Sequence, residues 1–369
     1  IQPPRGFGEN PIAIYHDPDL PPSHHYLAAY RWMDQTFGAD AMIHLGKHGT
    51  LEWLPGKGLG LSAECAPDAV LGDLPLIYPF IVNDPGEGTQ AKRRSHAIII
   101  DHLIPPMARA ETYGDLAKLE QLLDEYATVV ALDPEKVPTV RAQIWSVIQA
   151  AQLHHDMHTP EMPGDNEFDE FVLHLDGYLC EIKDVQIRDG LHILGQAPIG
   201  EARINLVLAI LRATQMWGGQ KDALPGLRGA IADHFGLDEV DLLARPGAFV
   251  EIPSTLKELV AGPANSASDA VDLIEGVARN LVVAMESHLW DLQTVARVVA
   301  DIFGSDVFKI SQVLEFAATQ VVPRLDRTTD ELGNLLHALN GGYVPAGPSG
   351  SPTRGLVNVL HTGRNFYSV

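Results

Sequence analysis

Two histidines and one glutamate follow one another at intervals of four in the segment HLGKHGTLEWLPGK, residues 44–57. They are His44, His48 and Glu52. A helix would place three such side chains on one face. If the segment instead follows a strand, His44 lies at the carboxyl end of that strand, where α/β sheets place their ligands. Either geometry brings two imidazoles and a carboxylate to one divalent cation, and this ligand set suits zinc, cobalt or nickel.

The same segment also permits a plainer interpretation. Gly46, Gly49 and Gly56 are typical of a loop, in which the two histidines would merely cap neighbouring elements. The segment is not the zinc-protease signature, because no glutamate directly follows the first histidine. A metal-dependent hydrolase is a further alternative, but beyond Glu52 the sequence offers no evident additional set of metal ligands.

A second segment, NDPGEGTQAKRR at residues 83–94, combines glycines with a run of basic residues. It follows a strand-like run and opens a predicted helix, so its backbone N–H groups can face an anion at the helix N-terminus. Arg93 and Arg94 add cationic groups that pair well with carboxylates. The alternative is a solvated basic helix face. No GxxxxGKS or GxxxxGKT phosphate-binding loop occurs in the chain, so we predict no nucleotide-binding site of that type in it.

Three shorter segments also carry arginines or histidines. GPSGSPTRG, residues 347–355, and HTGRNFYS, residues 361–368, can form a rigid loop that donates to anions, or a flexible tail with incidental arginines. HHDMH, residues 154–158, is interpreted as a solvated helix end. The sequence leaves undefined the role of its three histidines, His154, His155 and His158.

Secondary-structure patterns place these segments on an α/β framework. Short apolar runs predict four strands, at residues 12–16, 41–45, 76–82 and 97–103. The helical spacing of residues 23–37, with Ser23 as the N-cap, predicts a helix between the first two strands. Strands that alternate with helices favour a mostly parallel sheet.

From residue 110 onward the apolar spacing becomes helical. Helices are predicted around residues 116–126, 140–153, 168–179, 204–217 and 270–302, the last ending at Gly304. The predicted fold class is therefore an α/β N-terminal part with a mostly parallel sheet, followed by a large mainly α-helical part. The predicted domains are residues 1–110, residues 111–322, and residues 323–369, a helix plus a Gly/Pro/Arg-rich loop that returns to the site.

Composition excludes several classes of function. A net charge of −22 argues against binding to nucleic acid or to an anionic membrane surface. The apolar run of residues 204–211 is far shorter than the roughly 20 residues of a membrane span. Two cysteines, Cys65 and Cys180, cannot form a disulfide framework and are predicted to be buried thiols of a cytosolic protein. No signal-peptide pattern is found at the start.

Together, the segments resemble the large subunit of cobaltochelatase, whose family shares ancestry with the large subunit of magnesium chelatase. The resemblance is carried by HLGKHGTLEWLPGK, by GDLPLIYPFIVNDPGEGTQAKRRSHAIIIDHLIPPMARA, and by GPSGSPTRG with TGRNFYS. LEWLPGK and NDPGEG are similar to the cobalt-type sequences, whereas magnesium-type sequences carry Phe-Met after the glutamate and Asn-Pro-Ser-Glu in the second segment. His361 departs from the family, in which a proline precedes TGRN.

The resemblance implies a reaction and a set of partners. Cobalt(II), the substrate metal, would be inserted into a corrinoid-precursor tetrapyrrole, hydrogenobyrinic acid a,c-diamide, during aerobic cobalamin biosynthesis. ATP with Mg²⁺ would be hydrolysed only on two separate AAA+-type cobaltochelatase subunits, in agreement with the missing phosphate-binding loop. The location would be cytoplasmic. Because the family's large subunit is several times longer and this sequence begins with Ile1, we expect it to be a piece of a larger protein.

This reaction gives the segments distinct roles. The metal must lose water and two ring N–H protons must leave, so we predict that His44, His48 and Glu52 hold the cation and that Glu52 or His48 accepts a proton. The tetrapyrrole is a polycarboxylate, which favours cationic and polar groups around its rim. The predicted substrate-binding residues are Lys57, Glu87, Arg93, Arg94, Ser349, Arg354 and Arg364.

Two other functions stay open at the level of the sequence. A magnesium chelatase H-type subunit would insert Mg²⁺ into protoporphyrin IX, although LEWLPGK and NDPGEG argue against it. A noncatalytic module could instead recruit the AAA+ partners or store tetrapyrrole. The long helical middle of the chain, which carries little obvious chemistry, favours that second alternative.

Overall fold

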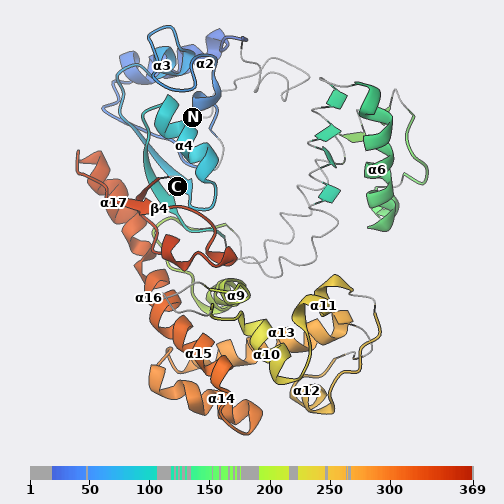
Figure 1. Ribbon diagram of the computed structural model, residues 1–369. Helices are drawn as coiled ribbons and strands as arrows, with labels where there is room; N and C mark the ends of the chain where they lie inside the picture. The colour runs from blue at the N-terminus through green and yellow to red at the C-terminus, as the bar shows by residue number, and fades with distance from the viewer. Residues whose placement is uncertain are drawn as a thin grey trace. The chain divides into compact units, whose positions relative to one another are not determined.

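The computed structural model describes most of the chain (Figure 1). The described residues are 19–46, 49–105, 118–119, 122–123, 125–126, 129–130, 134–151, 153–157, 159–164, 167–168, 171–172, 175, 191–215, 223–245, 248–262, 264 and 267–367. The chain divides into two units, one formed by Ile1–Ile104 together with His192–Val369 and the other by Pro105–Leu191. The three-domain division predicted from the sequence stays a prediction.

A small parallel sheet organises the first unit. Its strands are β1 (Met42–Ile43), β2 (Leu76–Ile81) and β3 (Ile98–His102), in the order β1-β2-β3, and both pairings are parallel. The central strand β2 is almost wholly buried, because elements cover both faces of the sheet. The predicted α/β part with a parallel sheet is confirmed, while the predicted strand at residues 12–16 lies outside the described residues.

Short helices cover one face of this sheet. They are α2 (His24–Arg31), α3 (Ala66–Leu71) and α4 (Pro85–Arg94). Ser23 is the N-cap of α2, as predicted, and its Oγ accepts the N–H of Tyr26 at 3.2 Å. Asp84 caps α4 in the same way. The core beneath these helices contains Tyr26, Tyr78, Phe80 and Phe366 among other apolar side chains.

The C-terminal segment closes against the opposite face and the edge of the sheet. Helix α17 (Asp330–Leu339) packs Leu335 and Ala338 against Ile77 and Ile100. Strands β4 (Ala346–Pro348) and β5 (Asn365–Tyr367) form a second parallel pair. The backbone of β3 bonds directly to the segment before β5, since Asp101 N–H donates to Arg364 O at 2.9 Å. The N–H of Gly350 donates to Val82 O at 2.9 Å, which brings the 347–355 loop to the end of β2.

The remainder of the first unit is helical, as the sequence predicts, and shares one large apolar core. Its helices are α9 (Gly200–Leu211), α10 (Leu227–His234), α11 (Glu239–Ala244), α12 (Ser254–Leu259), α13 (Ala267–Ser287), α14 (Val295–Phe303), α15 (Phe308–Phe316) and α16 (Val322–Leu325). Helix α13 contacts α9, α10, α11 and α12, so it lies at the centre of this core (Figure 1). None of the described helices is long and apolar enough to cross a membrane.

The apolar spacing over residues 270–302 predicts one continuous helix, and this prediction is wrong. Helix α13 ends at Ser287, and Leu289 and Trp290 have positive φ angles, which break the helix before α14 begins. The break persists because Trp290 is 5% exposed and its Nε1–H donates to Glu286. The predicted stop is confirmed, since Gly304 caps α14 with φ 78°.

The second unit is a small helical cluster. Its described helices include α6 (Val137–Ala150) and α7 (Leu153–Asp156), and its core contains Leu119, Tyr126, Ile144 and Phe168 among other residues. These positions agree with the predicted helices around residues 116–126 and 140–153. Most of the predicted helix at residues 168–179, including its neighbour Cys180, lies outside the described residues.

Candidate functional site

His44 extends the ladder of the sheet by one residue beyond β1. Its N–H donates to Ile77 O at 3.0 Å, so the side chain lies at the carboxyl end of the strand, in the second of the two geometries that the sequence permits. The Nε2 atom lies 3.1 Å from the hydroxyl of Tyr30, and the ring packs edge-on against Tyr78 with centroids 5.4 Å apart. Burial lowers the pKa of His44 to about 4, so the imidazole is neutral at neutral pH and retains a lone pair for a ligand.

Glu52 sits in the short 3-10 turn η2 (Leu51–Trp53) that follows the glycine-rich loop. Its side chain is 0% exposed, and within the described part of the chain neither carboxyl oxygen makes a well-aligned hydrogen bond. Burial raises the pKa of Glu52 to about 7, and the nearby Glu87 carboxylate adds to this rise, although the neighbouring Gly49 N–H and Tyr78 hydroxyl partly oppose it. A buried carboxyl group that titrates near neutral pH can both accept and release a proton.

Tyr78 belongs to this site, although no local pattern marks it in the sequence. A Cβ atom built on Gly49 would lie 2.7 Å from the Tyr78 hydroxyl and 2.7 and 2.8 Å from the two oxygens of Glu52. Three oxygens therefore converge beside the Gly49 Cα, and only glycine fits there. The Tyr78 hydroxyl is buried and, among the described residues, also lacks a well-aligned hydrogen bond. Tyr78 can be identified only from the pairing of β1 with β2, because that pairing places it beside His44.

The complete predicted metal triad is not visible in the described chain. Lys47 and His48 lie outside the described residues, so the place of His48 relative to the other two ligands stays a prediction. Among the residues that are described, no group of three His, Cys, Asp or Glu side chains is placed to hold a metal ion. The structure does place His44 and Glu52 around one shared residue, because Tyr78 contacts the imidazole ring and its hydroxyl lies beside the carboxyl group.

Arg94 holds the loop that carries Glu52. Its guanidinium donates to three backbone carbonyls in the loop that carries Glu52: to Glu52 O at 2.7 Å, Leu54 O at 2.7 Å and Lys57 O at 3.0 Å. The residue is 8% exposed, so its nitrogens are occupied inside the protein rather than offered to a ligand. Arg94 therefore fixes the backbone of the loop, and its contact with the substrate stays a prediction.

We expect Arg94→Ala to lower the free energy of unfolding by about 2–4 kcal/mol, because three buried carbonyls lose a charged donor. Arg93 is the matched control, since it is the adjacent residue of α4 and is exposed. Arg93→Ala should change the free energy of unfolding by less than about 0.5 kcal/mol. Denaturant unfolding of both variants measures the difference, and equal losses would contradict the loop-fixing role of Arg94.

The other predicted substrate residues of the N-terminal part are more accessible. Arg93 and Lys57 are exposed, and Glu87 is half-buried in the first turn of α4. Glu87 lies close enough to Glu52 to raise the pKa of that carboxyl group. The second sequence segment thus meets the first at the same end of the sheet, and its last helical turn is attached to β5 by Lys92.

The C-terminal predicted residues divide in a similar way. The Arg354 side chain is exposed, and the described part of the chain gives it no charged partner. Ser349 Oγ donates to Tyr367 O at 2.8 Å. The Arg364 guanidinium donates to Val359 O at 2.8 Å, and its backbone N–H donates to the buried Asp101 carboxyl group at 2.6 Å. Arg364 is therefore held within the fold, whereas Arg354 is free to meet a ligand.

A second buried carboxylate, Glu331, joins four segments that are far apart in the sequence. Its Oε1 accepts from Leu103 N–H at 2.8 Å and from the Thr362 hydroxyl at 2.5 Å. Its Oε2 accepts from His192 Nε2 at 2.6 Å and from Gly195 N–H at 2.9 Å. Glu331 is 0% exposed, and its hydrogen-bonding capacity is filled. No local pattern marks this residue in the sequence, because all four donors come from other segments.

The histidine cluster at residues 154–158 has no assigned chemistry. His154 is half-buried in the second unit and packs edge-on against Trp145, with ring centroids 6.5 Å apart. The side chain of His155 and the whole of His158 lie outside the described residues. Cys65 is 3% exposed, which confirms that this cysteine is a buried thiol.

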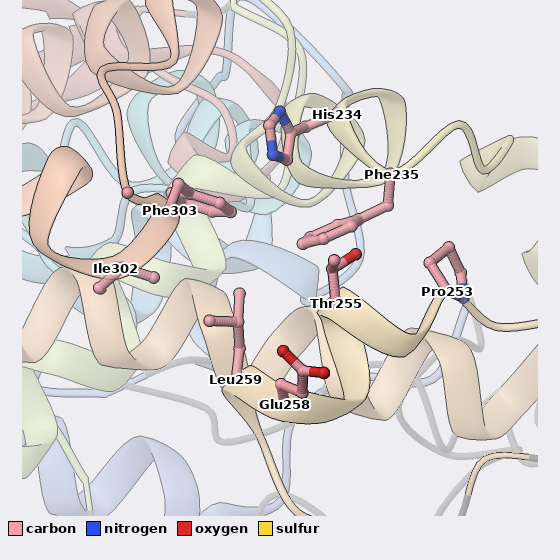
Figure 2. Close-up of a pocket in the computed structure, with 9 residues that line it drawn as sticks. His234, Phe235, Pro253, Thr255, Glu258, Leu259, Ile302 and Phe303 are labelled. Atoms are coloured by element: carbon pink, nitrogen blue, oxygen red, sulfur yellow. The ribbon is translucent and has the colours of Figure 1, made fainter.

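The helical part contains a separate hollow of about 470 Å³ (Figure 2). Figure 2 shows the rings of His234, Phe235 and Phe303 on one side of it and Glu258 on the other. The rings of His234 and Phe303 pack edge-on with centroids 4.9 Å apart. None of the site residues predicted from the sequence lines this hollow, so it is distinct from the site around Glu52.

Comparison with known proteins places the whole sequence in one group. The pattern of the family described as CobN/Magnesium Chelatase matches residues 1–369. The aerobic cobaltochelatase subunit CobN of Pseudomonas aeruginosa is 44% identical over 100% of this chain and 28% of that protein. The H-type subunit of magnesium chelatase from Chlorobaculum parvum is 31% identical over 100% of this chain and 28% of that protein.

A solved structure supports the same grouping. The catalytic subunit of cobaltochelatase from Mycobacterium tuberculosis is 59% identical, with a TM-score of 0.65, over 100% of this chain and 29% of that one. This chain thus spans less than a third of the length of the relatives that it matches.

Proposed function

The chain belongs to the CobN/Magnesium Chelatase family, and we propose that it forms the metal-inserting site of a cobaltochelatase large subunit. In this proposal the protein inserts Co²⁺, its substrate metal, into hydrogenobyrinic acid a,c-diamide in the aerobic synthesis of cobalamin. ATP is hydrolysed on two AAA+-type partner subunits rather than on this chain, and the complex works in the cytoplasm.

The observation that carries this proposal is the buried carboxyl group of Glu52, without a well-aligned hydrogen bond, beside Tyr78 and His44. Burying a carboxylate in this way costs several kcal/mol, unless a cation pairs with it, a proton neutralises it or a ligand forms hydrogen bonds with it. Metal insertion supplies all three: a Co²⁺ ion, the protons of two ring N–H groups, and the tetrapyrrole itself. Because the pKa of Glu52 is raised to about 7, the carboxylate can take up a ring proton at neutral pH.

Cobalt fits the ligands better than magnesium does. The neutral imidazole of His44 suits a borderline metal such as Co²⁺, whereas Mg²⁺ prefers an all-oxygen coordination shell. The segments LEWLPGK and NDPGEG, which resemble cobalt-type sequences, support the same choice. A magnesium chelatase H-type function is the second candidate, and tetrapyrrole that remains bound during purification would distinguish the two.

The carboxylates of the macrocycle are expected to bind exposed Arg and Lys side chains. Three of the residues predicted to contact the rim of the macrocycle have exposed side chains, namely Lys57, Arg93 and Arg354. In contrast, Arg94 is buried and Arg364 is half-buried. The 347–355 loop, which carries Arg354, reaches the end of β2 through the hydrogen bond from Gly350 to Val82. A polycarboxylate that lies at this end of the sheet can therefore contact cations from both ends of the chain.

The test of the function is a titration of the purified protein with the tetrapyrrole, followed by absorbance, with and without Co²⁺. The expected result is saturable binding, with a spectral change to the cobalt form only when Co²⁺ and the ATP-hydrolysing partners are present. Binding without any insertion under those conditions would favour the docking or storage alternative. Insertion of Mg²⁺ into protoporphyrin IX instead would favour the magnesium-type function.

We expect Arg354→Ala to weaken tetrapyrrole binding by about 1–3 kcal/mol, the range for a lost charge-assisted hydrogen bond. The insertion rate at saturating tetrapyrrole should change much less, because uniform binding energy affects affinity and not turnover. Steady-state insertion rates measured against tetrapyrrole concentration separate the two effects. Arg324 offers a matched control, since its guanidinium already bonds to Gln320, and Arg324→Ala should leave affinity unchanged.

A further inference from the structure

Three hydroxyl groups form a buried chain that ends on His44. The Thr50 Oγ1 atom lies 2.8 Å from the Tyr26 hydroxyl, which lies 3.3 Å from the Tyr30 hydroxyl, and Tyr30 lies 3.1 Å from His44 Nε2. Tyr26 is 0% exposed and Tyr30 is 4% exposed, so the two tyrosines at the middle of this series are shielded from bulk water, while Thr50 and His44 at its ends are half-buried. This chain of hydroxyl groups therefore connects Thr50 with His44, two positions of the candidate site that are six residues apart in sequence.

Helix α2 supplies the middle of this hydroxyl chain. Tyr26 and Tyr30 are four residues apart, which places them on one helix face, and their ring centroids are 5.1 Å apart. Ser23 fixes the start of the helix by capping it. Phenylalanine would fill the same apolar core, so the hydroxyls are not needed for packing. Buried hydroxyls cost stability unless they are paired, and here each one is paired with the next.

We propose that Tyr30 is a positioning residue that binds His44 Nε2 and leaves Nδ1 as the nitrogen that takes the Co²⁺ ion. This inference rests on the proposed function and adds to it. A histidine that binds a cation through one nitrogen is neutral and carries its hydrogen on the other, and the partner of that second nitrogen sets the ring orientation. With Nδ1 on the cation, Nε2 carries the hydrogen and donates it to the Tyr30 hydroxyl, 3.1 Å away.

The direction of donation along the chain follows from this assignment. His44 Nε2–H donates to Tyr30, the Tyr30 hydroxyl donates to Tyr26, and the Tyr26 hydroxyl donates to Thr50. Each tyrosine oxygen then accepts one hydrogen bond and donates one, as a hydroxyl group can. The opposite direction would place the hydrogen on Nδ1 and close that nitrogen to a cation. A cation on Nδ1 thus fixes the direction of donation along all three hydroxyl groups.

The far end of the chain lies next to the second candidate ligand. Thr50 immediately precedes the turn Leu51–Trp53 that contains Glu52, and it follows Gly49, which contacts the Glu52 oxygens. The same hydrogen bonds that orient His44 therefore also fix the entry to the Glu52 turn. Helix α2 therefore links the two candidate ligands, through Tyr30 at His44 and through Tyr26 at Thr50.

The test compares the Co²⁺ affinity of the purified protein, in its full natural length and without tetrapyrrole, among matched variants. Tyr30→Phe removes one oxygen and keeps the ring, and we expect it to weaken Co²⁺ binding about tenfold, the lower end of the range for partners of metal ligands. Tyr26→Phe, one step further along the chain, should weaken binding by less. Tyr343 is 79% exposed, so Tyr343→Phe is the unaffected control.

A double-mutant cycle separates positioning from general stabilisation. His44→Gln should itself weaken Co²⁺ binding, and adding Tyr30→Phe to it should produce no further loss, because Tyr30 acts only through His44. Changes in the visible absorption of bound Co²⁺ in Tyr30→Phe would report the altered ligand directly. Calorimetric titration measures all the affinities.

The outcomes distinguish this inference from the proposed function. If His44→Gln weakens Co²⁺ binding and Tyr30→Phe does not, the positioning role of Tyr30 is overturned and the proposed function stands. Independent, additive losses from the two substitutions would also overturn it, because Tyr30 would then act by general stabilisation. If His44→Gln itself leaves Co²⁺ binding unchanged, the metal site of the proposed function is wrong.

Discussion

Cobalt insertion is expected to fall by about a hundredfold or more in Glu52→Gln, the scale for loss of a positioned proton acceptor. Glutamine keeps the size of the side chain but removes its charge and its ability to take a proton. Tetrapyrrole affinity should stay within a few-fold, because Glu52 acts on metal and protons and not on the ring carboxylates. The steady-state insertion rate, measured with the ATP-hydrolysing partners present, checks both statements.

The pH dependence gives the same prediction a second readout. A carboxyl group with a pKa of about 7 is protonated below that pH and cannot accept a ring proton, so the wild-type rate should rise with pH through about 7. Glu52→Gln should lack this rise. The exposed neighbour Glu64 is the matched control, and Glu64→Gln should retain both the rate and the pH profile.

A stability measurement excludes misfolding as the cause of lost activity. The pKa of Glu52 is raised in the folded protein, from an ordinary value of 4.5 to about 7, so folding binds protons between these pH values and stability falls as pH rises through them. At pH 8 the buried charge destabilises the fold. Glu52→Gln should therefore be more stable than the wild type at pH 8, by up to about 3 kcal/mol. Reduced insertion together with reduced stability at pH 8 would contradict the assignment.

The free energy of unfolding is expected to fall by about 3–5 kcal/mol in Glu331→Ala. The substitution leaves four donors without an acceptor in a place from which water is excluded: Leu103 N–H, Gly195 N–H, His192 and Thr362. Each lost buried partner contributes about 1–3 kcal/mol, and relaxation of the site reduces the sum. Because Glu331 joins the end of β3 to α17, the loss should concentrate where the sheet meets the C-terminal segment.

Thermal unfolding and hydrogen exchange measure this effect together. The midpoint should fall by roughly 10 °C, and amide exchange should accelerate at Leu103 and Gly195, whose N–H groups lose their acceptor. Glu315 is an exposed glutamate of α15, and Glu315→Ala serves as the control with a change below about 0.5 kcal/mol. A loss below about 1 kcal/mol in Glu331→Ala would show that the four segments are held together by apolar packing alone.

Local sequence patterns determined the parallel strands and the ends of several elements. The apolar runs at residues 41–45, 76–82 and 97–103 enclose the observed β1, β2 and β3, because a strand covered on both faces needs nearly continuous apolar residues. The N-cap Ser23 and the stop at Gly304 were readable because capping depends on one or two neighbouring residues. His44 and Glu52 were selected by residue type and spacing, and the structure buries Glu52 completely and places His44 at the end of its strand.

Other features were decided by contacts between distant segments. Arg93 and Arg94 are indistinguishable in sequence, yet only Arg94 points into the loop of residues 52–57, since their directions depend on how α4 packs. The break after α13 lies at Leu289 and Trp290, which have positive φ angles, and Trp290 is buried there against other segments of the helical core.

The partners of the candidate site were likewise invisible in the sequence. Tyr30 and Tyr78 resemble ordinary core tyrosines until the fold places one hydroxyl at His44 and the other beside Glu52. Glu331 acquires its four donors only when β3, residues 192–195 and residues 361–363 converge on α17. Sequence spacing fixes which side chains share a strand or a helix face, but a buried polar group is satisfied by whatever the tertiary structure brings within about 3 Å of it.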